Sequence, residues 1–136
     1  MSTLTNIILL LSVIATKTPI YHSDIDENDE IFVYVKHYCH YSKKACKHLK
    51  RIKNITIVDV INKEFVRYDQ NTDTFIPVKT PVPGKLMGAF DVRNTVPQIF
   101  IYKNSQWHYI GGSDDVIQLN IVKNNNKKNP SPSLKL

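Results

Sequence analysis

Residues 31–61 read IFVYVKHYCHYSKKACKHLKRIKNITIVDVI, and they predict a strand, a helix and a second strand. Residues 31–36 are β-branched and aromatic, as in a buried strand. Residues 38–52 place Tyr41, Ala45, Leu49 and Ile52 on one helical stripe. Residues 55–61 form the next apolar run. A strand, helix and strand within about thirty residues predict a βαβ unit with a parallel strand pair.

The rest of the chain predicts two further strands and a closing helix. Residues 97–102 (PQIFIY) and 107–110 (WHYI) flank an Asn-Ser turn, so they are expected to pair antiparallel. Ser113 is a good helix N-cap, with Asp114 and Asp115 in the first turn. The apolar side chains of the predicted closing helix are Val116, Ile117, Leu119 and Ile121.

Residues 62–94 form an atypical insert. Residues 65–78 suggest a hairpin around Asp-Gln-Asn at 69–71, and residues 84–89 suggest a short helical turn. The prolines at positions 77, 81 and 83 argue against a regular helix.

Both ends of the chain lie outside the expected domain, residues 31–122. Within residues 1–30, residues 7–15 (IILLLSVIA) are too few to span a bilayer, so they are a signal, an anchor or a folded segment. Whether the protein contacts a membrane stays open. Residues 21–30 are acidic and suggest a linker. Residues 123–136 are basic and typical of a disordered tail.

Charge and cysteine content narrow the function classes. The net charge is +6, but aromatic residues do not alternate with the basic ones, so nucleic-acid binding is not expected. The chain has 136 residues and only two cysteines, Cys39 and Cys46, which do not make a disulfide-rich secreted scaffold. A reactive or metal-bound thiol in a reducing compartment such as the cytoplasm fits better.

Cys39 occupies the predicted junction between strand and helix. The unpaired N–H groups and positive end of a helix favour a thiolate there, and Lys43, Lys44 and Lys47 follow within two turns. A thiolate is the form that attacks a disulfide. The alternative is a buried, inert cysteine in a turn.

Three segments together resemble the glutaredoxin family. They are Lys36-x-x-Cys39-x-Tyr41, Thr95-Val96-Pro97, and Gly111-Gly112-Ser113-Asp114-Asp115, and they occur in the family's order. The resemblance covers residues 31–122. It implies an α/β, thioredoxin-like fold with a four-stranded mixed sheet flanked by helices. It also implies a glutathione-dependent oxidoreductase that acts on glutathionylated or disulfide-bonded proteins.

The resemblance also implies a role for each motif residue. Cys39 is the catalytic nucleophile, and Val96, before a cis Pro97, holds the cysteinyl part of glutathione. Lys36 pairs with a glutathione carboxylate. The γ-glutamyl end meets Ser113, Asp114 and Asp115. Tyr41 and Thr95 belong to the same glutathione site.

The sequence departs from the family pattern at Ser42, at Ser113, which stands where the Gly-Gly motif has a cysteine, and in residues 62–94. Ser42 replaces the second cysteine of dithiol members, which implies a monothiol mechanism. Cys46 cannot replace that thiol, because seven helical residues span ~10.5 Å and a disulfide needs Cα atoms within ~7 Å.

Two other functions remain open. One is metal binding, either an iron–sulfur cluster shared by two Cys39 thiols and two glutathiones, or zinc held by His37, Cys39, Cys46 and His48. The other is a non-catalytic binding module that uses the insert as its partner surface.

Overall fold

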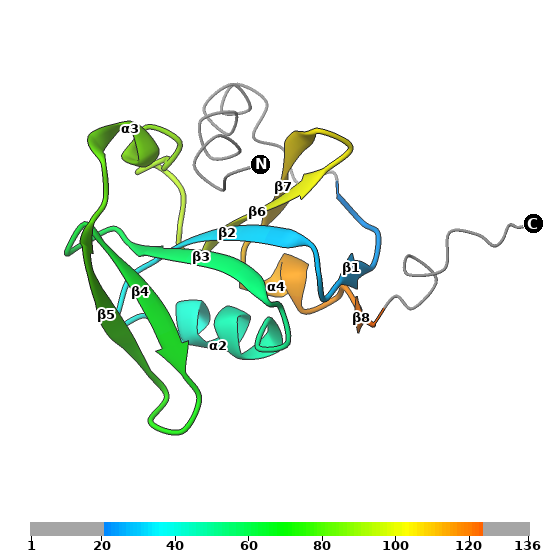
Figure 1. Cartoon of the computed structure of the whole chain (residues 1–136), viewed down its shortest axis with the longest axis horizontal. Coiled ribbons are helices and arrows are strands. Elements are labelled where there is room, and N and C mark those ends of the chain that lie inside the picture. The colour runs from blue at the N-terminus through cyan, green and yellow to red at the C-terminus, as the bar shows by residue number, and fades with distance from the viewer. Residues whose placement is uncertain (1–20, 124–136) are drawn as a thin grey trace, which may run out of the picture.

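The computed structural model describes residues 21–123, which contain a six-stranded sheet, a two-stranded sheet and three short helices. The elements in chain order are β1 (Ile25–Asp26), β2 (Glu30–Val35), α2 (His40–His48), β3 (Asn54–Asp59), β4 (Glu64–Asp69), β5 (Thr74–Pro81), α3 (Gly84–Met87), β6 (Gln98–Lys103), β7 (Gln106–Gly111), α4 (Ser113–Val116) and β8 (Ile121–Val122). The large sheet has the strand order β5-β4-β3-β2-β6-β7 (Figure 1).

The strand directions follow the sequence patterns closely. β2 and β3 are parallel, with Ile31 opposite Ile55, because α2 carries the chain back between them. β6 pairs antiparallel with β2 on its other side, and β7 pairs antiparallel with β6. The predicted βαβ unit and the predicted hairpin after it are therefore both present.

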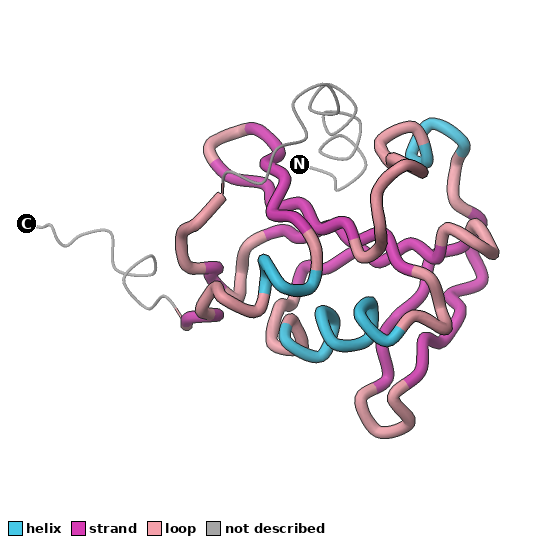
Figure 2. The backbone as a smooth tube through the Cα atoms, turned by 180° about the vertical axis from the view of Figure 1, so that it is seen from behind, coloured by secondary structure: helices cyan, strands magenta, loops and turns pink. Residues whose placement is uncertain are grey.

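The expected thioredoxin-like fold, a four-stranded sheet flanked by helices, is wrong. The insert is the main cause, because β4 and β5 form a hairpin that pairs antiparallel with β3 and widens the sheet to six strands. Asp59 turns the chain into that hairpin, since its carboxylate accepts a hydrogen bond from the Ile61 amide at 2.9 Å. Helices cover little of this sheet (Figure 2).

The closing helix is also shorter than predicted. α4 ends at Val116, and the chain then forms β8, which pairs parallel with β1. Ile25 of β1 is fully buried in the core, so the acidic segment before β2 is not a linker. The Arg51 guanidinium forms an ion pair with the Glu27 carboxylate, with 3.9 Å between nitrogen and oxygen.

The alternation of side chains along β2 separates two apolar clusters. Ile31, Val33 and Val35 pack on the face that α2 and α4 cover, whereas Phe32 and Tyr34 pack on the face that carries α3. The Tyr34 hydroxyl donates a hydrogen bond to the Leu86 carbonyl in α3. Burial of the Tyr34 side chain raises its pKa above the ordinary value for tyrosine.

The buried stripe of α2 differs by one position from the expected one. Ala45 and Leu49 are buried as predicted, but Ser42 and Cys46 are buried with them, and Tyr41 is 55% exposed. A helix that begins at His40 turns Tyr41 outward, toward the cleft described below.

Within residues 21–123, no helix is long and apolar enough to cross a bilayer. Residues 7–15, expected to be a signal, an anchor or a folded segment, lie outside the described residues, and so do residues 124–136 of the tail expected over 123–136.

Candidate functional site

Cys39 lies at the junction of β2 and α2, as the sequence predicts. It is the N-cap residue of α2, and its carbonyl accepts the first helical hydrogen bond from the Lys43 amide at 3.1 Å. The Cys39 amide donates to the Lys36 carbonyl at 2.9 Å, which closes a tight turn between strand and helix. The Cys39 thiol is free and half-buried.

Ser42 has a structural position that its motif does not reveal. It is fully buried, and its hydroxyl accepts a hydrogen bond from the Lys36 amide at 3.3 Å. The residue that replaces a second cysteine therefore ties the first turn of α2 to the end of β2.

The segment before β6 brings a second part of the chain to Cys39. The sulfur lies 4.0 Å from the carbonyl oxygen of Val96. The Val96–Pro97 peptide bond is cis, which confirms the prediction for Pro97. Gln98 holds the preceding loop, because its side-chain amide donates to the Asp91 carbonyl at 2.8 Å and its side-chain oxygen accepts from the Asp91 amide at 3.2 Å.

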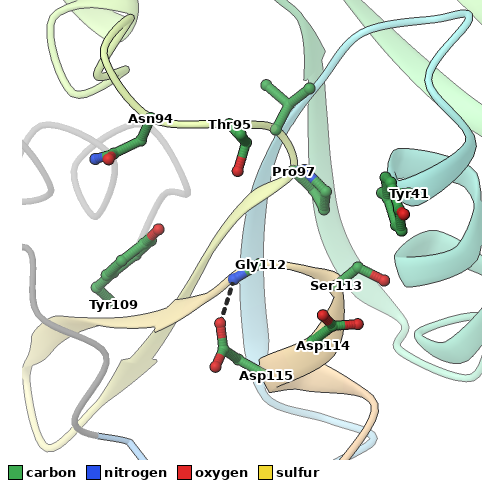
Figure 3. A pocket seen from close by; sticks show the side chains of 10 residues that line it. Tyr41, Asn94, Thr95, Pro97, Tyr109, Gly112, Ser113, Asp114 and Asp115 are labelled. Carbon is green, nitrogen blue, oxygen red and sulfur yellow. Dashed lines mark hydrogen bonds between the residues drawn. The ribbon is translucent and has the colours of Figure 1, made fainter.

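A cleft of about 430 Å³ opens beside Val96 (Figure 3). It brings together seven of the nine predicted site residues: Tyr41, Thr95, Val96, Pro97, Ser113, Asp114 and Asp115. The other lining residues, which sequence reasoning missed, are Asn94, Tyr109 and Gly112. Cys39 reaches the cleft through its contact with Val96, although it is not itself a lining residue.

Tyr109 shows why part of the cleft could not be predicted. It lies in β7, where period-two alternation places it on the same face as Trp107, and its ring packs against Phe100. Burial raises its pKa, and the nearby carboxylates of Asp115 and Asp91 raise it further. The sequence predicts the pairing of β6 with β7, but the cleft also needs Tyr41 of α2 and the start of α4, which only the tertiary structure brings together with Tyr109.

The turn between β7 and α4 forms the floor of the cleft. Gly111 has a φ of +119°, and a Cβ atom there would lie 2.2 Å from the Asp115 carboxylate. The helix N-cap is Gly112 and not Ser113, because the Asp115 carboxylate accepts from the Gly112 amide at 2.8 Å. Asp115 therefore caps the helix, and the prediction for Ser113 is one residue late.

This shift leaves two polar groups of the turn available to a ligand. The Ser113 side chain is 5% exposed, and its hydroxyl has no hydrogen-bond partner among the described residues. The Asp114 carboxylate is exposed and makes no hydrogen bond or ion pair within residues 21–123. Both groups line the cleft.

Lys36 and its neighbour His37 lie beside the site and not in it. Lys36 contacts Cys39 and Ser42 through its backbone, but its side chain does not line the cleft. His37 points toward β3, where its Nδ1 lies 3.0 Å from the buried carboxylate of Asp59. This pair anchors the turn that carries Cys39.

The four residues considered as zinc ligands are not brought together. Cys46 is buried in the core beneath α2, where burial raises the pKa of its thiol well above the ordinary value. The Nε2 atom of His48 lies 2.8 Å from the Leu119 carbonyl oxygen, and Nδ1 of His37 contacts the Asp59 carboxylate. In the part of the chain that the structure describes, no group of three or more His, Cys, Asp or Glu side chains could hold a metal ion.

No protein-family model matches this chain, and no curated protein or solved structure is significantly similar to it.

Proposed function

We propose that the protein is a glutathione-dependent thiol–disulfide oxidoreductase of the glutaredoxin type, with Cys39 as its only catalytic thiol. The observation that carries this proposal is the 4.0 Å contact between the Cys39 sulfur and the Val96 carbonyl, at the edge of a cleft lined by most of the glutathione-binding motif residues. A nucleophile and a binding cleft for its co-substrate are the two parts that such chemistry needs.

The proposed reaction has two exchange steps. The Cys39 thiolate attacks the glutathionyl sulfur of a protein–glutathione disulfide, which forms a Cys39–glutathione disulfide and releases the protein thiolate. Solvent protonates that thiolate. A second glutathione, as its thiolate, then attacks the glutathionyl sulfur on Cys39, which forms oxidised glutathione and restores the Cys39 thiolate. The protein–glutathione disulfide is reduced to the protein thiol, and one free glutathione is oxidised as it joins the transferred glutathionyl group in oxidised glutathione.

The cleft supplies polar groups that suit both ends of glutathione. The cysteinyl part would lie along the Val96 main chain, because Val96 is next to the sulfur. The Asp114 carboxylate suits the γ-glutamyl ammonium, and the unpartnered Ser113 hydroxyl can donate to the α-carboxylate beside it. Tyr41 and Thr95 add hydroxyl-bearing side chains to the lining of the cleft (Figure 3).

The one-thiol mechanism follows from the separation of the two cysteines. Cys39 packs toward the apolar cluster on the α3 face of the sheet, whereas Cys46 is buried in the cluster beneath α2. Cys46 is 2% exposed and cannot meet a disulfide at Cys39 without unfolding the helix.

The test is reduction of a glutathionylated peptide by glutathione, coupled to glutathione reductase and NADPH. The Cys39→Ser protein should show only the uncatalysed rate, while Cys46→Ala should keep at least about half of the wild-type kcat/KM. Equal loss in the two variants would refute the one-thiol mechanism. No activity in the folded wild-type protein would refute the proposed function.

A further inference from the structure

The exposed side of α2 carries positive charge that the chain does not neutralise. Residues 40–53 contain six Lys and Arg residues and no Asp or Glu. Of these six, only Arg51 forms an ion pair within residues 21–123, with Glu27. Like charges this close on one helix are unfavourable for the isolated fold, which suggests a role in binding an anion.

The lysines line a groove and do not simply project into solvent. His40, Lys43, Lys44 and Lys47 form one wall of a groove of about 300 Å³, and Asp73 in the β4–β5 turn lies on the other. The Tyr68 hydroxyl donates to the Asp73 carboxylate, so this carboxylate already has a partner. The groove, defined by these five lining residues, holds three lysines against the single carboxylate of Asp73 and is therefore cationic.

Cys39 borders both the groove and the glutathione cleft. His40, which directly follows Cys39, lines the groove, and Tyr41 lines the cleft. The cleft is lined by residues of α2, β7, α4 and the segment before β6, while the groove is lined by α2 and the β4–β5 turn. A protein joined to glutathione by a disulfide at this point could occupy the groove while its glutathione occupies the cleft.

We propose that this groove binds an acidic segment that flanks the disulfide cysteine of the substrate protein. The inference rests on the proposed function and adds the class of substrate. Separate Glu or Asp side chains can contact Lys43, Lys44 and Lys47 while avoiding Asp73. A nucleic acid or a membrane presents continuous negative charge that would meet the Asp73 carboxylate, and the groove lining has a single aromatic ring, that of His40, whereas stacking of successive bases needs several.

The first test compares two glutathionylated peptides that differ only in having Glu or Gln on both sides of the cysteine. The Lys44→Gln/Lys47→Gln protein should lose about 3- to 10-fold in kcat/KM for the Glu peptide, because each exposed charge pair contributes little. Its loss in kcat/KM for the Gln peptide should be clearly smaller, because any effect of the two lysines on the Cys39 thiol acts equally on both peptides. High salt should remove the difference between the peptides.

The matched control is Lys79→Gln/Lys85→Gln, which removes the same net charge from exposed positions outside the groove. Equal losses in the two double variants would mean that only net charge matters, and this would overturn the proposal. Equal losses for the Glu and Gln peptides would do the same.

A second measurement does not depend on catalysis. A fluorescent Glu-rich peptide without cysteine should bind the Cys39→Ser protein at low salt, and Lys44→Gln/Lys47→Gln in that background should weaken binding by a similar factor. Binding with no turnover by wild type would support the groove while refuting the proposed function. Tighter binding to single-stranded RNA or to anionic phosphatidylserine vesicles than to the peptide would overturn an acidic protein segment as the occupant.

Discussion

The sulfur of Cys39 lies 4.0 Å from the carbonyl oxygen of Val96, a residue 57 positions later in the chain. β2 and β6 are antiparallel neighbours in the sheet, so the C-terminal end of β2 lies beside the start of β6. This contact joins the Cys39 thiol to the cleft.

The two thiols should differ strongly in reactivity. At pH 8, iodoacetamide should label Cys39 and leave Cys46 unmodified, because Cys46 is 2% exposed and burial raises the pKa of its thiol. Mass spectrometry of the native protein should show one adduct, and the urea-unfolded protein should show two. Two adducts in the native protein would mean that α2 opens readily.

Cys46 should also make stability depend on pH. A buried thiol whose pKa is raised in the folded state contributes its full stability below the unfolded thiol pKa of about 8.5, and this contribution falls as the pH rises above it. Between pH 9 and 10, wild type should therefore lose unfolding free energy faster than Cys46→Ala, by about 1.4 kcal/mol per pH unit. Urea unfolding at each pH measures this difference. Parallel slopes in the two proteins would contradict it.

Gly111 and Gly112 should respond very differently to alanine. Gly111→Ala should cost about 1–3 kcal/mol of unfolding free energy, because φ is +119° and the new Cβ would meet the Asp115 carboxylate at 2.2 Å. Gly112→Ala should stay within about 0.5 kcal/mol of wild type, since the nearest atom there is the Pro97 oxygen at an ordinary 3.5 Å. Chemical unfolding of the two variants checks this contrast.

Ser113→Ala should weaken glutathione binding without weakening the fold. The buried hydroxyl has no internal partner in the described residues, so its removal should leave the unfolding free energy equal or slightly higher. If the hydroxyl binds the γ-glutamyl carboxylate, KM for the glutathionylated peptide should rise about tenfold with kcat nearly unchanged. A destabilised variant would show that the hydroxyl has a structural partner instead.

Lys36→Ala should raise the KM for the glutathionylated peptide less than Ser113→Ala does, because Lys36 does not line the cleft.

Ser42→Cys should introduce dithiol chemistry. Position 42 follows Cys39 by three residues at the start of α2, and this spacing brings two sulfurs within bonding reach. After mild oxidation, the count of free thiols should fall from three to one. Ser42→Ala is the control, because it measures the loss of the Lys36–Ser42 hydrogen bond, about 1 kcal/mol, without adding a thiol. Three free thiols after oxidation would contradict the expected spacing.

Local patterns determined most of the secondary structure, because strands and helices bury side chains with fixed periods. The strands around α2, the β6–β7 hairpin and the hairpin within the insert all follow from alternation and turn residues. The position of Cys39 at a helix N-cap follows from the same patterns, and so does the choice of the three motif segments, eight of whose residues share one cleft.

Only the tertiary structure decided how these elements combine. No local pattern shows that the β4–β5 hairpin pairs with the edge of β3, or that β1 and β8 pair with each other, because these partners lie far apart in sequence. Asn94 and Tyr109 likewise line one cleft with Tyr41, which lies far from both in sequence. The cap of α4 is a local contact, because the Asp115 carboxylate accepts from the Gly112 amide three residues before it. The sequence determined which residues could act in chemistry, and long-range strand pairing decided which of them meet.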